Sequence, residues 1–326
     1  MSDFARTPAH RLAGPLAALT LGVTLLTGLP ALTATAATTT VTAGVAAAGV
    51  TAGMTPTVEA PGISPGIPVP TATTTGVPTG TRLSVHEGDL KITVPGTIID
   101  GYDIHGIVFI TAPDVTIRNS IIRGRPVTAN TGLINAQSPT VKNLYIDSVE
   151  LAPTTPSVYL TGIYGHDLTI RRSNIHHVVD GIHLLGDNVR VYRNWVHDLS
   201  YFSVDPAQKN GPTHNDDIQI QKGTNIWIKD NTLTGASNAA IQVTQDQGPV
   251  TSLGIENNLI TGGGCSLNIA EKGKGTITRL TITDNTFGTS TYNCNAIIDT
   301  PTRTHPTTTI TNNNRTDGKT TTIMTR

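Results

Sequence analysis

The chain has 326 residues, enough for one large domain or two ordinary ones. Charged residues make up only 14% of it and its formal net charge is −1, so the chain lacks the basic field that holds nucleic acid. Its 32 glycines and its low aromatic content of 4% suit an all-β protein with many tight turns.

The first 36 residues have the pattern of an export signal. A polar start leads into the apolar run 12–32, and Ala34-Thr35-Ala36 forms a small-residue cleavage site. A membrane anchor is the alternative, but glycines and prolines interrupt the run and no cationic stop follows it. We therefore expect a signal peptide at 1–36, a secreted, extracellular protein, and no membrane attachment after cleavage.

Residues 37–80 are rich in Thr, Ala and Pro, with almost no charge and no sustained period. This composition predicts a disordered linker without catalytic residues. The folded domain is expected over 81–326.

From about residue 81 a short pattern recurs, in which two apolar residues alternate with polar ones and an Asn or Ser follows. The spacing from Asn231 to Asn258 and from Asn258 to Asn285 is 27 residues in each case. Such self-similarity is typical of a solenoid, and strands without intervening helices predict a parallel β-helix with one short strand per face and coil. The recurring Asn is expected to stack on its copies as a hydrogen-bonded ladder inside a turn, a structural role.

A second set of strands can be stacked in the same way, with Ile182, Ile218, Ile241 and Leu267 pointing inward. The outward residues then form a polar column about 4.8 Å apart from coil to coil, close to the repeat of a sugar chain. This column is the predicted substrate-binding surface, and Gln221 continues it on the same wet face. Its members are Tyr164, His183, Gln219, Gln242 and Asn268.

The two cysteines, Cys265 and Cys294, stand at equivalent positions of adjacent coils in this alignment. Neighbouring parallel strands bring such Cα atoms to about 5 Å, within reach of a disulfide. We predict a Cys265–Cys294 bridge, which fits an oxidising compartment.

Three carboxylates crowd together in the alignment. Asp180 and Asp216 each come shortly before a strand in consecutive coils, and Asp217 adjoins Asp216. Their mutual repulsion requires compensation, and three interpretations remain open. A Ca²⁺ ion could bind all three, one carboxyl could stay protonated and act as an acid, or one could cap a turn while another pairs with Lys209 or Arg172.

Candidate acid–base groups flank this cluster. His183 faces outward in the column and His214 opens the charged segment, while Lys272 follows Glu271 two coils further on. Lys272 could serve as a base only if burial lowered its pKa, and a surface lysine is the alternative. The irregular segment 201–213 ends at the cluster and is expected to form a wall of a binding cleft.

With this coil period and Asn ladder, residues 82–318 resemble the pectate lyase-like superfamily of right-handed parallel β-helix proteins. The chain also resembles secreted β-helix repeat proteins of actinobacteria. Asn215-Asp216-Asp217-Ile218 is similar to the adjacent aspartates of polygalacturonase-type glycosidases in that superfamily. The resemblance implies right-handed coiling and an activity on acidic polysaccharides.

The leading functional hypothesis is a polysaccharide lyase that cleaves uronic-acid chains by β-elimination. His183 or His214 would act as the base and Tyr164 or Lys272 as the acid, while the column amides or a cation neutralise the uronate carboxylate. An inverting hydrolase using Asp216 and Asp217 with Asp246 or Glu271, a non-catalytic glycan-binding module and a uronate C5-epimerase are the alternatives. We expect an acidic polysaccharide as partner, no nucleic acid, and a monomer.

Overall fold

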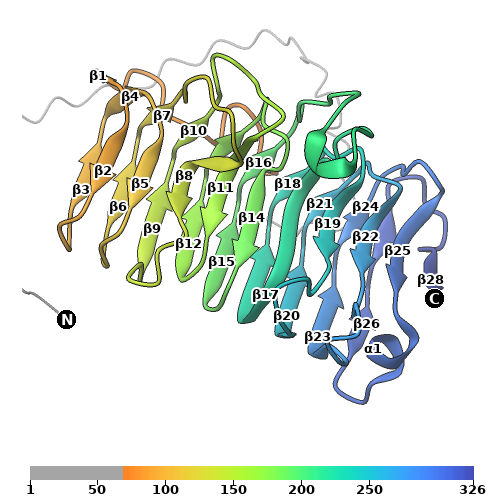
Figure 1. Ribbon diagram of the computed structural model, residues 1–326. Helices are drawn as coiled ribbons and strands as arrows, with labels where there is room; N and C mark the ends of the chain where they lie inside the picture. Colours follow the sequence, from red (N-terminus) through yellow and green to blue (C-terminus); the bar gives the residue numbers. More distant parts are fainter. Residues whose placement is uncertain (1–68) are drawn as a thin grey trace, which may run out of the picture. The chain divides into compact units, whose positions relative to one another are not determined.

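The computed structural model describes residues 69–326, which form a stack of coils along one axis (Figure 1). The fold is an all-β, right-handed parallel β-helix, as the sequence predicts. The predicted export signal and residues 37–68 of the predicted linker lie outside the described residues. Residues 69–80 belong to the fold, since Thr75 is buried and the Gly76 N–H donates to the Arg172 carbonyl at 2.8 Å, so the linker boundary at residue 80 was placed too late.

Each complete coil contributes one short strand to each of three parallel faces, called sheets A, B and C below. Sheet A carries two-residue strands in most coils, because a corner follows directly. Its strands are β1 (Ser84–Glu87), β4 (Tyr102–His105), β7 (Ile121–Ile122), β10 (Glu150–Leu151), β13 (Asn174–Ile175), β16 (Trp195–Val196), β18 (Thr232–Leu233), β21 (Leu259–Ile260), β24 (Thr286–Phe287) and β27 (Asn314–Arg315).

Sheet B carries the functional surface discussed below. Its strands are β2 (Leu90–Ile92), β5 (Val108–Ile110), β8 (Thr131–Ala136), β11 (Leu160–Gly165), β14 (Ile182–Leu185), β17 (Asp216–Lys229), β19 (Ala239–Val243), β22 (Cys265–Ile269), β25 (Cys294–Ile298) and β28 (Ile323–Thr325).

Sheet C completes each coil, and β17 is long enough to run through both sheet B and sheet C. Its other strands are β3 (Ile98–Asp100), β6 (Thr116–Arg118), β9 (Leu144–Asp147), β12 (Leu168–Arg171), β15 (Val189–Tyr192), β20 (Val250–Glu256), β23 (Thr278–Thr283) and β26 (Thr309–Thr311). Two short helical segments interrupt the strands of the described region: the 3₁₀ turn η1 (Pro206–Gln208) and α1 (Thr300–Thr304). No described helix has both the length and the apolar character needed to cross a membrane.

The core is a continuous column of aliphatic side chains, because every second residue of each strand points inward. Ile182, Ile218, Ile241 and Leu267 are paired in register and fully buried, as predicted. This inward set fixes which residues of sheet B face outward, since a slip of one residue would exchange the two faces.

The Asn ladder runs between sheets C and A. Asn194, Asn231, Asn258, Asn285 and Asn313 occupy the same corner of successive coils, and each Nδ2 donates to the next Oδ1 at 2.9–3.0 Å. The residue before each ladder position is left-handed, with φ near 50–60° at Arg193, Asp230, Asn257, Asp284 and Asn312. Asn and Asp adopt this conformation at low cost, which explains why polar residues precede the ladder.

The disulfide joins Cys265 and Cys294, the first residues of β22 and β25. The two residues are paired in register and their Cα atoms are 4.6 Å apart. The predicted bridge is therefore confirmed, and it ties together two of the last coils of sheet B.

Candidate functional site

The predicted polar column is present on the outer face of sheet B. Tyr164 pairs with His183, His183 with Gln219, Gln219 with Gln242, and Gln242 with Asn268 in the strand register. All five residues line one pocket of about 720 Å³. The column is thus the floor of a groove rather than a flat solvated face.

The groove crosses six consecutive strands of sheet B, from the residues that flank β8 to Asn268 in β22. Five strand spacings of about 4.8 Å give it a length of about 24 Å. The irregular segment 201–213 forms one wall, as predicted, and contributes Asp205, Ala207 and Gln208. The turn after β19 contributes Thr244 and Asp246.

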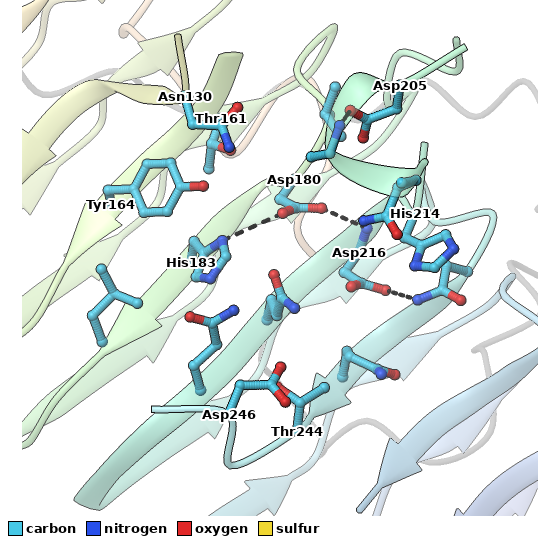
Figure 2. Close-up of a pocket in the computed structure, with 18 of the residues that line it drawn as sticks. Asn130, Thr161, Tyr164, Asp180, His183, Asp205, His214, Asp216, Thr244 and Asp246 are labelled. Atoms are coloured by element: carbon cyan, nitrogen blue, oxygen red, sulfur yellow. Dashed lines mark hydrogen bonds and ion pairs between the residues drawn. The ribbon is translucent and has the colours of Figure 1, made fainter. Parts of the chain in front are cut away.

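A buried carboxylate pair lies at the edge of the floor (Figure 2). The backbone N–H of Asp216 donates to Oδ1 of Asp180 at 3.1 Å. Oδ1 of Asp216 accepts from Nδ2 of Asn238 at 2.8 Å and from the N–H of Ala239 at 2.9 Å. Both carboxylates are buried, with 8% exposure for Asp180 and 1% for Asp216.

Burial raises the pKa of Asp216 well above its ordinary value, because an ionised carboxylate loses solvation there. The neighbouring charge of Asp180 raises this pKa further, while the hydrogen bonds from Asn238 and Ala239 oppose the rise. Asp216 therefore keeps its proton to a higher pH than a free aspartate. This supports the interpretation in which one carboxyl stays protonated.

His183 is the central side chain of the groove floor, with only 5% of its surface exposed. Its Nδ1 lies 3.4 Å from Oδ2 of Asp180, a close contact without hydrogen-bond geometry. Its ring stacks on Tyr164, with centroids 4.5 Å apart and planes inclined by 29° (Figure 2). Burial raises the pKa of Tyr164, and the charge of Asp180 adds to the rise, so Tyr164 stays protonated at neutral pH.

Several buried polar atoms of the groove have no hydrogen-bond partner among the described residues. They are both ring nitrogens of His183, Oε1 of Gln242 and Oγ1 of Thr244. Buried polar atoms in folded proteins almost always have a partner. These atoms have almost no surface open to the groove, so a ligand reaches them only when side chains of the floor move.

Asp217 does not face the groove, contrary to the prediction. Its side chain is fully buried and Oδ1 accepts the N–H of Gly235 at 3.0 Å, in the turn that follows β18. Burial raises its pKa well above the ordinary value. The side chain lies in the corner where the chain enters sheet B, so the structure does not place Asp217 where its predicted catalytic or metal-binding role requires it.

The three interpretations of the aspartate cluster can now be compared. The three-aspartate calcium site does not form, since Asp217 points away, and residues 69–326 contain no cluster of three or more His, Cys, Asp or Glu arranged to hold a metal ion. Arg172 does not pair with Asp180 or Asp216 but binds Asp147 through Nε and Nη2 at 2.9 and 2.7 Å. The capping part of the third interpretation fits Asp217, which accepts an N–H of the turn after β18, whereas Asp180 accepts a backbone N–H of the next coil.

Glu271 and Lys272 lie in the turn after β22. Oε1 of Glu271 accepts from Oγ1 of Thr302 at 2.6 Å, and its N–H donates to Asp299. Glu271 is not among the residues that line the groove, and its carboxylate is engaged by Thr302, so the structure does not place it for the predicted contact with substrate. Lys272 lines the groove but is exposed, which removes the burial on which its role as a base depended.

The remaining predicted residues lie where expected. His214, Gln221 and Asp246 line the groove, and His214 and Asp246 are exposed on its walls. The sequence reasoning missed Asp205 and Asn238. The Asp205-Pro206 pair was a usable signal, since Asp205 caps η1 by accepting the N–H of Ala207 at 2.8 Å.

A family model described as the right-handed beta helix region matches residues 85–252, slightly more than half of the chain. The chain belongs to the right-handed β-helix family. This family includes polysaccharide-degrading enzymes such as pectate lyases and polygalacturonases. No curated protein and no solved structure gives a significant match. The β-helix continues beyond the matched residues, because the strand register is unbroken to β28.

Proposed function

We propose that this β-helix protein is a secreted polysaccharide lyase that cleaves a uronic-acid polymer by β-elimination. The observation that carries the proposal is the stacked pair of His183 and Tyr164, with the Asp180 carboxylate 3.4 Å from the imidazole. The pair offers one group to accept a proton and one to donate it, on the floor of a long polar groove.

The groove suits a sugar chain in length and chemistry. At about 24 Å it accommodates about five sugar units at the strand spacing. Gln219 and Gln242 lie in the floor and can donate amide N–H bonds to a uronate carboxylate. Oδ1 of Asn268 accepts from Nη1 of Arg326 at 2.8 Å, which leaves the amide N–H groups of Asn268 for the ligand.

The proposed chemistry assigns separate roles to the stacked rings. Once the bound polymer displaces the side chains that cover it, Nε2 of His183 accepts the C5 proton, and the Asp180 carboxylate beside Nδ1 stabilises the imidazolium that forms. Tyr164 keeps its proton at neutral pH and donates it to the O4 leaving group. The raised pKa of Asp216 extends to higher pH the range in which this carboxyl is uncharged, which favours an anionic polymer.

Secretion is part of the proposal. A disulfide persists in oxidising compartments such as the cell exterior, so the Cys265–Cys294 bridge supports it. The sequence pattern of residues 1–36 supports it independently.

The test is incubation with defined uronate polymers while ultraviolet absorbance and reducing ends are followed together. A lyase produces both signals at equal rates, because each cleavage creates one unsaturated end and one reducing end. Tyr164→Phe should strongly lower the rates of both signals and leave polymer binding intact, whereas Tyr192→Phe on β15 of sheet C should change neither rate. Polymer cleavage without the ultraviolet signal would refute the proposal.

An inverting hydrolase is the second candidate, and the raised pKa of Asp216 favours it. A protonated Asp216 could act as the general acid, with Asp246 on the wall as the base that activates water. New reducing ends without unsaturated products would select this function. Incorporation of solvent deuterium at C5 without cleavage would indicate an epimerase, and binding without either change would indicate a glycan-binding module.

A further inference from the structure

The acid and the base of the proposed lyase reach the substrate from the same side. Tyr164 in β11 and His183 in β14 are paired positions of neighbouring strands, so both side chains project from the floor of the groove. Their rings stack at a centroid distance of 4.5 Å (Figure 2). A sugar ring lying on the floor therefore meets both groups with one of its faces.

This spacing does not fit groups that act on opposite faces of a sugar ring. Reacting atoms approach to about 3–3.5 Å, so a base and an acid on opposite faces stand about 6–7 Å apart with the ring between them. Stacked rings leave no room for a sugar between them. Tyr164 and His183 must act on neighbouring atoms of the same face.

Of the titratable groups that line the groove, Tyr164 is the one paired with His183 in the strand register and stacked on its ring. Tyr159 is half-buried, and His214, Asp246 and Lys272 are exposed, while the Asp205 carboxylate is engaged in capping η1. Asp216 is held at the edge of the floor by Asn238 and Ala239.

Resting on the proposed function, we infer that the elimination is syn and that the substrate is a 4-linked uronate whose C5 proton and C4 oxygen lie on one ring face. In uronates of gluco or manno configuration O4 is equatorial and lies on the same face as the C5 proton. In galacturonate and guluronate these two groups lie on opposite faces. The site is therefore built for glucuronate- or mannuronate-type polymers.

The reaction balances without a co-reactant. Nε2 of His183 takes the C5 proton, and the electrons of the C5–H bond form the C4=C5 double bond. The C4–O4 bond breaks, its electron pair stays on O4, and the phenol of Tyr164 gives O4 a proton. Transfer of a proton from His183 to Tyr164 through solvent restores the starting state.

The experiment compares four homopolymers at equal uronate concentration: glucuronan, polymannuronate, polyguluronate and polygalacturonate. The rate of unsaturated product is measured under saturating conditions, so that differences in affinity do not enter. We expect glucuronan or polymannuronate to be cleaved at least about a hundredfold faster than the other two, the cost of an acid placed on the wrong face.

Two results overturn the inference in distinguishable ways. Cleavage of polygalacturonate or polyguluronate with unsaturated products, at a rate equal to or above that of the other pair, would refute the syn geometry and leave the lyase proposal standing. Absence of unsaturated products from all four polymers would refute both. Tyr164→Phe should lower the turnover of the preferred polymer with little change in KM, a split that a merely structural role would not produce.

Discussion

Replacing Asp217 with Asn tests whether the adjacent aspartates have different roles. The side chain is fully buried, one of its oxygens accepts from Gly235, and Oδ2 has no partner among the described residues. Because burial raises the pKa of Asp217 in the folded protein, its contribution to stability is fully present below the unfolded value of 3.8 and is lost as pH rises toward the folded value. Asp217→Asn removes this loss and keeps the shape of the side chain.

The expected magnitude follows from linkage. The free energy of unfolding of the variant, relative to wild type, should rise with pH by up to about 1.4 kcal/mol per pH unit, starting near pH 4 and ending at the folded pKa of Asp217. Urea unfolding from about pH 3 to pH 8 measures the difference. Asp284→Asn, which removes an exposed carboxyl, should show a difference within about 0.5 kcal/mol throughout. A pH-independent difference for Asp217→Asn, or loss of lyase activity, would refute the assignment of Asp217 to the fold.

Three further predictions concern the ladder, the disulfide and metal dependence. Asn258→Ala should lower the free energy of unfolding by about 4 kcal/mol, since it removes four buried hydrogen bonds at about 1 kcal/mol each. Asn313→Ala, at the half-buried end of the ladder, should lower the free energy of unfolding by about half as much. Equal losses of unfolding free energy for the two variants in urea titrations would contradict the ladder argument. Cys294→Ser should lower the free energy of unfolding by about 3–4 kcal/mol, because the bridge closes a loop of 29 residues. A thermal or urea midpoint equal to that of wild type would contradict a stabilising role of the disulfide. Chelation by EDTA should leave the rate of unsaturated product unchanged. In the proposed route amide groups bind the uronate carboxylate, and Asp217 faces away from the groove. A large drop in this rate that added Ca²⁺ restores would contradict the prediction.

The fold and the groove floor were predictable because both depend on repetition. An Asn that returns after 27 residues in two successive coils indicates the coil length, and strict alternation then decides which residues face out. The positions of His183, Gln219 and Gln242 follow from that register alone.

Corners and loops were less predictable, because their geometry depends on contacts between distant residues. Asp217 turns inward because the Gly235 N–H lies beside it, and alternation carries no information about that contact. Asp205 reaches the groove from a segment without a period, so only its role in capping η1 could have marked it.

The most direct test of the central claim is a crystal structure of Tyr164→Phe with a glucuronate or mannuronate oligomer. We predict an oligomer along the column, with C5 of one sugar within about 3.5 Å of Nε2 of His183 and O4 of the same sugar next to the ring of residue 164. An oligomer bound elsewhere on the protein, or one whose C5 proton points away from His183, would contradict the account.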